Sequence, residues 1–227
     1  MKILFSGSSS FTGYHFLRKF EKKKFEYHAI FTKKKKYYRL AHQKKILNSK
    51  LSYANLHFDI KFGSKEFINI IKNKKINILC FHHFVVGNLN LKYNLNRNLN
   101  ILMNNIDKAL YNLSLNKSPL LIYTSSIYQK ISLLSGYKSD QSRTYYGFAK
   151  TAINNVLIYL CKKYKIKFID FELQNPIGLY EKQLSLPSYI ASGFFKKNQI
   201  KINNPHRVFK FQFIDKIAYD YCKTQLV

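Results

Sequence analysis

The sequence has little of several features that mark particular protein classes. Its three cysteines, Cys80, Cys161 and Cys222, are odd in number and far apart, which fits neither a disulfide framework nor a zinc-binding pattern. No apolar run approaches the roughly 20 residues that span a bilayer, and turn residues follow the first apolar residues too early for a signal peptide. We therefore expect a cytoplasmic protein without a transmembrane segment.

Acidic residues are also scarce. Eleven Asp and Glu stand against 39 Lys and Arg, which gives a formal net charge of +28. Such a charge suits a nucleic acid or an anionic membrane as partner. However, Lys, Asn, Ile, Phe and Tyr are all abundant while Trp is absent, a bias that AT-rich coding produces, and the lysines are scattered. A nucleic-acid site would need basic residues interleaved with exposed aromatics, and Tyr37-Tyr38-Arg39 is the only candidate, so we expect no specific nucleic-acid partner.

The order of apolar segments predicts an α/β fold. With 227 residues, 46% of them apolar, the chain can build one substantial core. Strand-like runs alternate with helical stretches, which is typical of a Rossmann-type doubly wound parallel sheet. The predicted strands are Lys2–Ser6, Tyr27–Phe31, Asn55–Asp59, Ile76–His82, Pro119–Ser125 and Ile166–Leu173. The predicted helices are Gly13–Lys24, Ser64–Asn73, Leu91–Leu115 and Thr144–Tyr164. We assign residues 1–173 to a dinucleotide-binding domain and residues 174–227 to a small C-terminal substrate-binding lobe that is not independent.

A glycine-containing turn, residues 7–13, follows the first strand and precedes the first helix. Gly7 permits a tight turn, Gly13 lets the helix pack close to the strand, and N–H groups at the helix N-terminus face a pyrophosphate. Ser10 stands where a middle glycine is expected. The residues predicted to bind a dinucleotide here are Gly7, Ser9, Ser10, Phe11, Thr12 and Gly13. A plain strand-to-helix connection is the alternative.

The second predicted strand ends without the carboxylate that would accept a hydrogen bond from the ribose of NAD. Thr32 and Lys33 stand there, at the start of a run of four lysines. Cations favour a 2′-phosphate, so NADP is the expected cofactor and NAD the alternative. Asp59, at the end of the third strand, is predicted to accept from the adenine amino group. A solvated lysine loop and a turn acid are the other interpretations of these residues.

Tyr146 and Lys150 lie four residues apart in a predicted helix and therefore share one face. A phenol with a pKa near 10 is a poor acid–base catalyst at neutral pH. A neighbouring ammonium stabilises the phenolate and lowers that pKa. Ordinary surface packing is the alternative, since the chain is rich in both residues. The pair follows a strand that ends in Tyr123-Thr124-Ser125-Ser126.

Taken together, these segments resemble the extended short-chain dehydrogenase/reductase family, in its nucleotide-sugar epimerase/dehydratase branch. The resemblance covers nearly the whole chain. The matching residues, in order, are Gly7-x-x-x-Phe11-x-Gly13, Asp59-Ile60, Asn96, Thr124-Ser125-Ser126-Ile127-Tyr128, Tyr146-x-x-x-Lys150, Asn175-Pro176-Ile177-Gly178, and Arg207 with Phe213-Ile214-Asp215-x-x-Ala218.

The resemblance implies hydride transfer between a nicotinamide cofactor and a carbon of a nucleotide-activated sugar. Tyr146 would move the proton, Lys150 would also hold the nicotinamide ribose, and Thr124 would bind the reacting oxygen, although alignment on the strand favours Ser125 or Ser126. Ile60 and His82 are further implied cofactor contacts. The implied substrate contacts are His83, Ser125, Ser126 and Asn175.

Two departures from the family narrow the expected reaction. Ser125-Ser126 stands where dehydratases of the family carry Asp-Glu, and Ser126 stands where the GDP-fucose synthase group has a cysteine. Reduction of a 4-keto-6-deoxy sugar is therefore the leading expectation, supported by Asn175, and 4-epimerisation is the alternative. The fourth strand ends in Phe81-His82-His83-Phe84, which is bulkier than the family's His-x-Ala-Ala. Adjacent strand residues face opposite sides, so the two histidines are not expected to share a metal.

A non-catalytic NADP-binding sensor or regulator on the same fold is the rival from another class. The presence of Thr124, Tyr146 and Lys150 argues against it. By resemblance, we also expect a homodimer formed through the helices at residues 91–115 and 144–164. Cell-surface polysaccharide synthesis is the expected setting.

Overall fold

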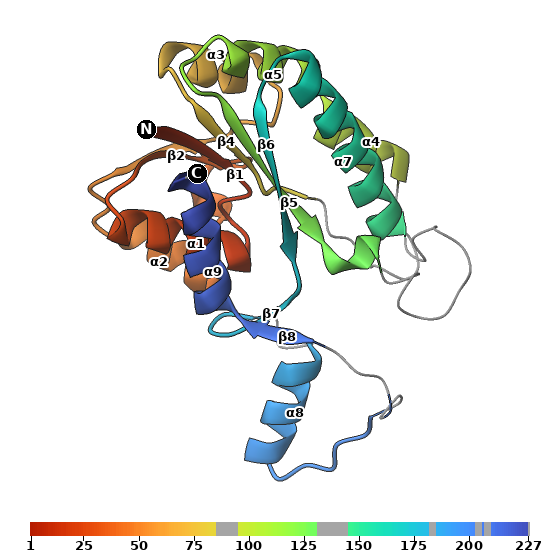
Figure 1. Ribbon diagram of the computed structural model, residues 1–227. Helices are drawn as coiled ribbons and strands as arrows, with labels where there is room; N and C mark the ends of the chain where they lie inside the picture. The colour runs from red at the N-terminus through yellow and green to blue at the C-terminus, as the bar shows by residue number, and fades with distance from the viewer. Residues whose placement is uncertain (85–94, 131–144, 182–184, 203–205, 207–209, 227) are drawn as a thin grey trace.

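A six-stranded parallel sheet forms the centre of the protein, seen in a computed structural model that describes residues 1–84, 95–130, 145–181, 185–202, 206 and 210–226 (Figure 1). Its strands are β1 (Lys2–Ser6), β2 (Glu26–Phe31), β3 (Ala54–Phe58), β4 (Ile78–Phe81), β5 (Leu120–Ser126) and β6 (Lys167–Leu173). Their order is β3-β2-β1-β4-β5-β6, and every neighbouring pair is parallel. The predicted doubly wound sheet is confirmed. The strand order reverses between β1 and β4, the place where such sheets bind ligands.

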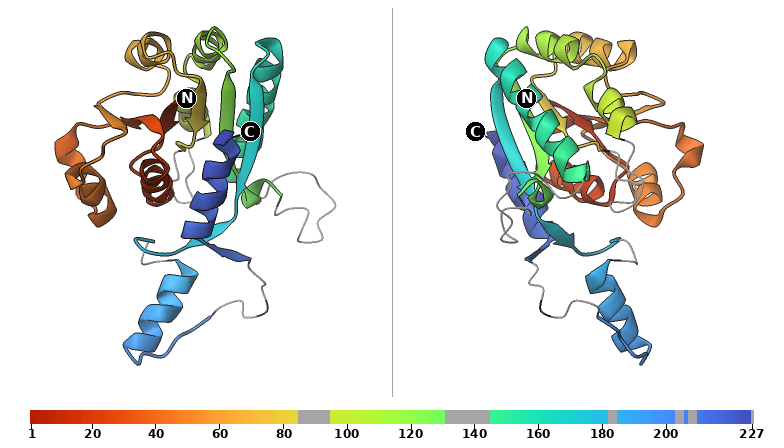
Figure 2. Two further views of the ribbon diagram at one scale, coloured as in Figure 1. Left: turned by 60° about the vertical axis from the view of Figure 1, so that its left-hand side comes forward. Right: turned by 90° about the vertical axis from the view of Figure 1, so that its right-hand side faces the viewer.

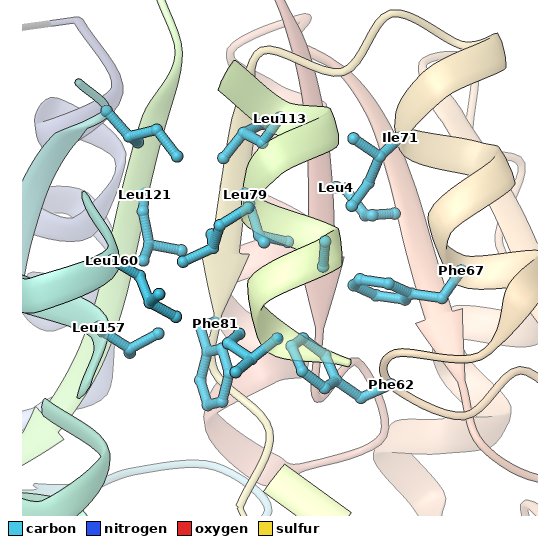
Figure 3. Packing of buried hydrophobic residues seen from close by; sticks show 14 of the residues in the cluster. Leu4, Phe62, Phe67, Ile71, Leu79, Phe81, Leu113, Leu121, Leu157 and Leu160 are labelled. Atoms are coloured by element: carbon cyan, nitrogen blue, oxygen red, sulfur yellow. The ribbon is translucent and has the colours of Figure 1, made fainter. Parts of the chain in front are cut away.

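Two layers of helices bury the faces of this sheet. The helices of these layers are α1 (Phe11–Lys22), α2 (Ala41–Asn48), α3 (Lys65–Asn73), α4 (Leu95–Met103), α5 (Ile106–Ser114), α7 (Tyr145–Lys163) and α9 (Ile214–Lys223), whereas α8 (Leu186–Phe195) lies apart from the sheet. The 3₁₀ turns are η1 (Lys35–Tyr37), η2 (Ile127–Gln129) and η3 (Thr224–Leu226). Residues Leu4, Leu79 and Leu121 face α3, α5 and α7 (Figure 3), whereas Ile3 and Cys80 face the opposite layer. Since both faces are covered, the inner strands are continuous apolar runs.

The expected single helix over residues 91–115 is two helices, α4 and α5, with residues 91–94 outside the described part. Asn105, with φ at 48°, separates them. The amide of Asn104 donates to the Phe62 carbonyl at 3.1 Å, and that of Asn105 donates to the Gly63 carbonyl at 2.8 Å. The prediction was wrong here because side-chain amides bind a distant loop at the break, which periodicity does not reveal.

Gly63 is the residue that this contact requires. Its φ is 69°, and a Cβ built on it would lie 1.7 Å from the Asn104 carbonyl oxygen. We expect Gly63→Ala to lower the free energy of unfolding by about 2 kcal/mol, because the methyl group must displace backbone and the positive φ is strained. Urea denaturation would measure the loss, with Ser64→Ala as a neighbouring control that removes only a helix cap. Equal stability of Gly63→Ala and the parent would contradict the close approach.

The segment after β6 divides into two parts. Strands β7 (Asn175–Ile177) and β8 (Phe211–Phe213) pair in parallel, and α8 projects from them, away from the main sheet (Figures 1 and 2). In contrast, α9 packs against α1 and buries Ile217 and Tyr221 in the core of the sheet. The division at residue 173 therefore stays a prediction, with α9 packed on the first domain. Within the described residues, none of the helices is both long and apolar enough to cross a membrane.

Candidate functional site

A cleft of about 990 Å³ opens at the carboxyl ends of the central strands, and we call it the edge cleft. Its lining brings together twelve of the residues that the sequence predicts as site residues. These are Gly7, Ser9, Ser10, Thr12, Thr32, Lys33, His82, His83, Thr124, Ser125, Tyr146 and Lys150. Six predicted residues are not part of the lining, namely Phe11, Gly13, Asp59, Ile60, Ser126 and Asn175.

The turn after β1 has the construction that its sequence predicts. The Ser10 hydroxyl accepts from the Gly13 N–H at 2.9 Å, which caps α1, and donates to the Gly7 carbonyl at 2.9 Å. A Cβ on Gly13 would lie 2.5 Å from the Gly7 oxygen, so the helix packs directly on the turn. Gly7, with φ at 89°, lies against the backbone of His82 and His83. Free N–H groups at the start of a helix form a site for anions.

The lining has cations and no carboxylate among the described residues. Lys33, Lys61, Arg97 and Lys150 contribute positive charge. The N–H of Lys33 donates to the Tyr38 hydroxyl at 2.8 Å, which fixes the backbone at the end of β2. This charge pattern fits a ligand with several phosphates.

Asp59, the predicted adenine contact, lies exposed in the turn after β3. Its φ is 60°, and its N–H donates to the Lys33 carbonyl at 3.3 Å. Asn175 lies in β7, where its amide donates to the Lys210 carbonyl at 3.1 Å. Both residues hold local structure, and their roles in binding stay predictions.

Lys150 is almost completely buried, with 3% of its surface exposed. Its Nζ donates to the Thr124 carbonyl at 2.6 Å and lies 4.2 Å from the ring centre of Phe84 and 4.9 Å from that of Tyr123. Burial disfavours the ammonium and lowers the pKa of Lys150 to about 7, against a smaller opposing effect of Asp170. The charge on this amine therefore changes near neutral pH.

Tyr146 lies one helical turn before Lys150, half-buried at the wall of the edge cleft. Its ring makes edge-to-face contacts with two other rings. The ring centroids are 5.0 Å apart for Phe84 and 6.0 Å apart for Tyr128. Phe84 thus contacts both members of the pair. The sequence indicates that Phe84 is larger than its family counterpart, and the structure shows what the added ring touches.

His82 and His83 face opposite sides of the sheet, as strand alternation predicts. His82 stacks on Phe5 and lies between Thr12 and Thr124. His83 packs against Phe62 and Phe81, and its Nδ1 lies 2.9 Å from the Ser6 hydroxyl. Burial lowers the pKa of each histidine to about 3, so both rings are neutral at physiological pH.

Helix α4 and Asn104, which directly follows it, supply cleft residues that were not predicted from the sequence. Asn96, which carried part of the resemblance, is exposed and lies outside the lining, whereas Asn98 is buried within it. Arg97, Ile101 and Asn104 also line the cleft. Their spacing of three and four residues is a helix-face pattern that could have identified them. Lys61 and Phe62 had no comparable signal, and Arg207 falls outside the described residues.

Comparison with solved structures identifies similar folds. UDP-glucuronic acid 4-epimerase from Bacillus cereus, solved with UDP-glucuronic acid and NAD, matches with a TM-score of 0.78 and 13% identity over 100% of this chain and 74% of the other. UDP-glucose 4-epimerase from Thermus thermophilus, complexed with NAD, has a TM-score of 0.75 and 13% identity over 100% and 75% of the two chains. A dTDP-glucose 4,6-dehydratase from Streptomyces venezuelae matches with a TM-score of 0.75 and 11% identity over 100% of this chain and 72% of the other.

No family model and no curated protein sequence matches this chain. The structural likeness is therefore found at very low sequence identity, and it concerns the fold. It agrees with the resemblance carried by the motifs at residues 7–13 and 146–150. The chain shares the fold of these nucleotide-sugar epimerases and of this dehydratase.

Proposed function

We propose that this protein is an NAD(P)-dependent oxidoreductase that acts on a nucleotide-activated sugar. One observation carries the proposal: Tyr146, Lys150 and Thr124 line the same cleft as the glycine turn at residues 7–13. The fold thus brings a proton-transfer pair and a phosphate-binding turn, which are far apart in the sequence, to the same cleft. The similar structures named above contain NAD or a nucleotide sugar, which supports the same assignment.

The residues present fit a dinucleotide at the phosphate end of the cleft. The capped start of α1 would hold the pyrophosphate, with Ser9, Ser10 and Thr12 beside it. Lys33 and Lys61 would hold a 2′-phosphate, since no described carboxylate lines the cleft to take a ribose hydroxyl. We therefore propose NADP as the preferred cofactor, while NAD in the similar structures keeps NAD as the alternative.

A charge reversal at Lys33 tests this preference. We expect Lys33→Glu to weaken NADPH binding about tenfold, because a charge-assisted hydrogen bond to phosphate is lost and repulsion replaces it. NADH binding should change less than twofold. Fluorescence titration with both cofactors measures the effect, and Lys36→Glu, in the exposed turn η1 outside the lining, is the matched control. Equal losses for NADPH and NADH would contradict the assignment.

The chemistry of the site is a balanced transfer of a hydride and a proton. When bound, a nicotinamide would supply hydride-transfer chemistry, as a donor to a carbonyl carbon or as an acceptor from an alcohol carbon. Tyr146 gives its proton to the keto oxygen in the first direction and takes the hydroxyl proton in the second. Lys150, when charged, stabilises the phenolate that remains.

We propose reduction of a 4-keto-6-deoxy sugar as the first reaction and 4-epimerisation as the second. Ser125-Ser126 favours simple hydride transfer over dehydration, and two similar structures are 4-epimerases. Incubation with NADPH and a panel of keto and hydroxy nucleotide sugars separates these reactions. A reductase consumes NADPH in equal amount with the sugar, whereas an epimerase interconverts two sugars without net change in cofactor.

The same panel also tests the rival function. Binding to the folded protein must raise its melting temperature, so thermal shift identifies the nucleotide sugar that binds. Cofactor binding without turnover of any bound sugar would support a sensor. Failure of both cofactors to bind would overturn the proposed function.

A homodimer through the helices at residues 91–115 and 144–164 is part of the proposal. Tyr111 on α5 and Phe148 and Tyr159 on α7 are large apolar residues exposed within these ranges. The size of the protein in solution, measured by light scattering, tests it. Cytoplasmic synthesis of surface polysaccharide is the setting that we infer for such an enzyme.

A further inference from the structure

His82 connects the glycine turn with the strand that bears Thr124. Its Nε2 lies 2.7 Å from the Thr12 hydroxyl and 3.2 Å from that of Ser10. Its Nδ1 lies 3.0 Å from the Thr124 hydroxyl. The ring is buried and stacks on Phe5. One imidazole therefore joins hydroxyl groups from two walls of the edge cleft.

A neutral imidazole carries a single N–H, so its two nitrogens have opposite roles. The low pKa of His82 keeps the ring neutral. The Ser10 hydroxyl already donates its only hydrogen to the Gly7 carbonyl at 2.9 Å. Its oxygen can only accept from the Nε2 of His82. If Nε2 carries the hydrogen, it can donate to the hydroxyl oxygens of both Ser10 and Thr12. If Nε2 carries no hydrogen, its lone pair faces a lone pair of the Ser10 oxygen, which is repulsive.

Nδ1 is then the acceptor, and the Thr124 hydroxyl donates to it. The Thr124 oxygen can then accept a hydrogen bond in the edge cleft, which Thr124 lines. A sugar hydroxyl can give such a bond, but a keto oxygen cannot.

We propose that His82 is a positioning residue that holds Thr124 as a hydrogen-bond acceptor, so that the site receives the alcohol form of its sugar. This inference rests on the proposed function. Of the two reactions proposed there, it favours the second, epimerisation, which begins by oxidation of a hydroxyl, over the first, which requires entry of a keto sugar. A keto oxygen formed in the site would rely on Tyr146 as its donor.

Nitrogen NMR tests the tautomer without any turnover. In protein labelled with ¹⁵N, long-range correlations between ring nitrogens and carbon-bound protons distinguish Nε2–H from Nδ1–H, and loss of one signal set in His82→Gln assigns the residue. We expect the Nε2–H form at pH 7. Thr12→Val should shift His82 towards Nδ1–H, while Thr12→Ser should not. Ser114→Ala, which removes a hydroxyl that donates to the Tyr111 carbonyl on α5, is the control that should change nothing. The Nδ1–H form in the parent protein would overturn the proposal.

A pair of substitutions separates positioning from general support of the fold. The amide of asparagine reaches the place of Nδ1, and that of glutamine the place of Nε2. We expect His82→Asn to keep kcat within about threefold, and His82→Gln to lower kcat about tenfold, the equivalent of one hydrogen bond. The positioning role would be overturned if both variants lost kcat equally and in proportion to the fall in their melting temperatures. A confirmed tautomer with no cofactor binding would instead reject the proposed function alone.

Discussion

Tyr146→Phe should lower kcat about 1,000-fold and leave the dissociation constant of NADPH within twofold of the parent value. General acid–base catalysis contributes about 10²- to 10⁴-fold in rate, and phenylalanine has no proton to transfer. The ring contacts with Phe84 and Tyr128 do not require the hydroxyl. The fold should therefore persist, and the loss should appear in the chemical step alone. Single-turnover oxidation of NADPH measures it.

Tyr145 provides a matched control for this experiment. It precedes Tyr146 on α7 but is 66% exposed and lies outside the edge cleft. Tyr145→Phe should therefore keep full activity. Comparable activity in Tyr146→Phe would remove this phenol from the mechanism and leave the edge cleft as a binding site.

Lys150→Met should have opposite effects on activity and stability. Activity should fall at least 100-fold, because no ammonium remains to stabilise the phenolate. Yet the free energy of unfolding at pH 6 should rise by about 1–3 kcal/mol, because a cation whose burial outweighs the favourable charge of Asp170 is replaced by an apolar side chain of similar length. The gain is limited by the lost hydrogen bond to the Thr124 carbonyl.

The stability advantage of Lys150→Met over the parent should shrink as the pH rises above 7. The folded-state pKa of Lys150 lies near 7, below the ordinary 10.5. Between these values the folded protein has released the proton while the unfolded chain still binds it, so stability from this group rises with pH. The free energy of unfolding of the parent should therefore approach that of Lys150→Met as pH rises from 7 to about 10. Lys162→Met, an exposed position on the same helix, should show no such trend. A constant difference across this range would contradict the burial of a titrating amine.

The sequence predicts elements whose signal is local. The inner strands of the sheet appear as apolar runs because both faces are buried, and the glycine turn appears because only glycine fits against the backbone of residues 82 and 83. The break between α4 and α5 was missed because it depends on amides that bind a loop 42 residues away. Likewise, the return of α9 onto α1 depends on tertiary packing.

In the candidate site, too, the residues with a local sequence signal could be predicted, whereas the contacts between distant segments could not. Tyr146 and Lys150 follow from helical spacing, and the cations near Lys33 follow from composition. The contact of Phe84 with both residues of the pair could not be predicted, because it requires the end of β4 and the start of α7 to meet. The tie between His82 and Thr124 also joins neighbouring strands that are distant in sequence.

The central place of β1 has a consequence for biosynthesis. Ile3 pairs with both Tyr27 and Ile78, so β1, which precedes both of its partner strands in the chain, is hydrogen-bonded on its second side only after β4 has left the ribosome. Until then a nascent chain presents an open apolar strand edge, which is a template for association with other chains. Ribosomes that pause between residues 31 and 78 should therefore increase the demand for chaperones that cover such an edge.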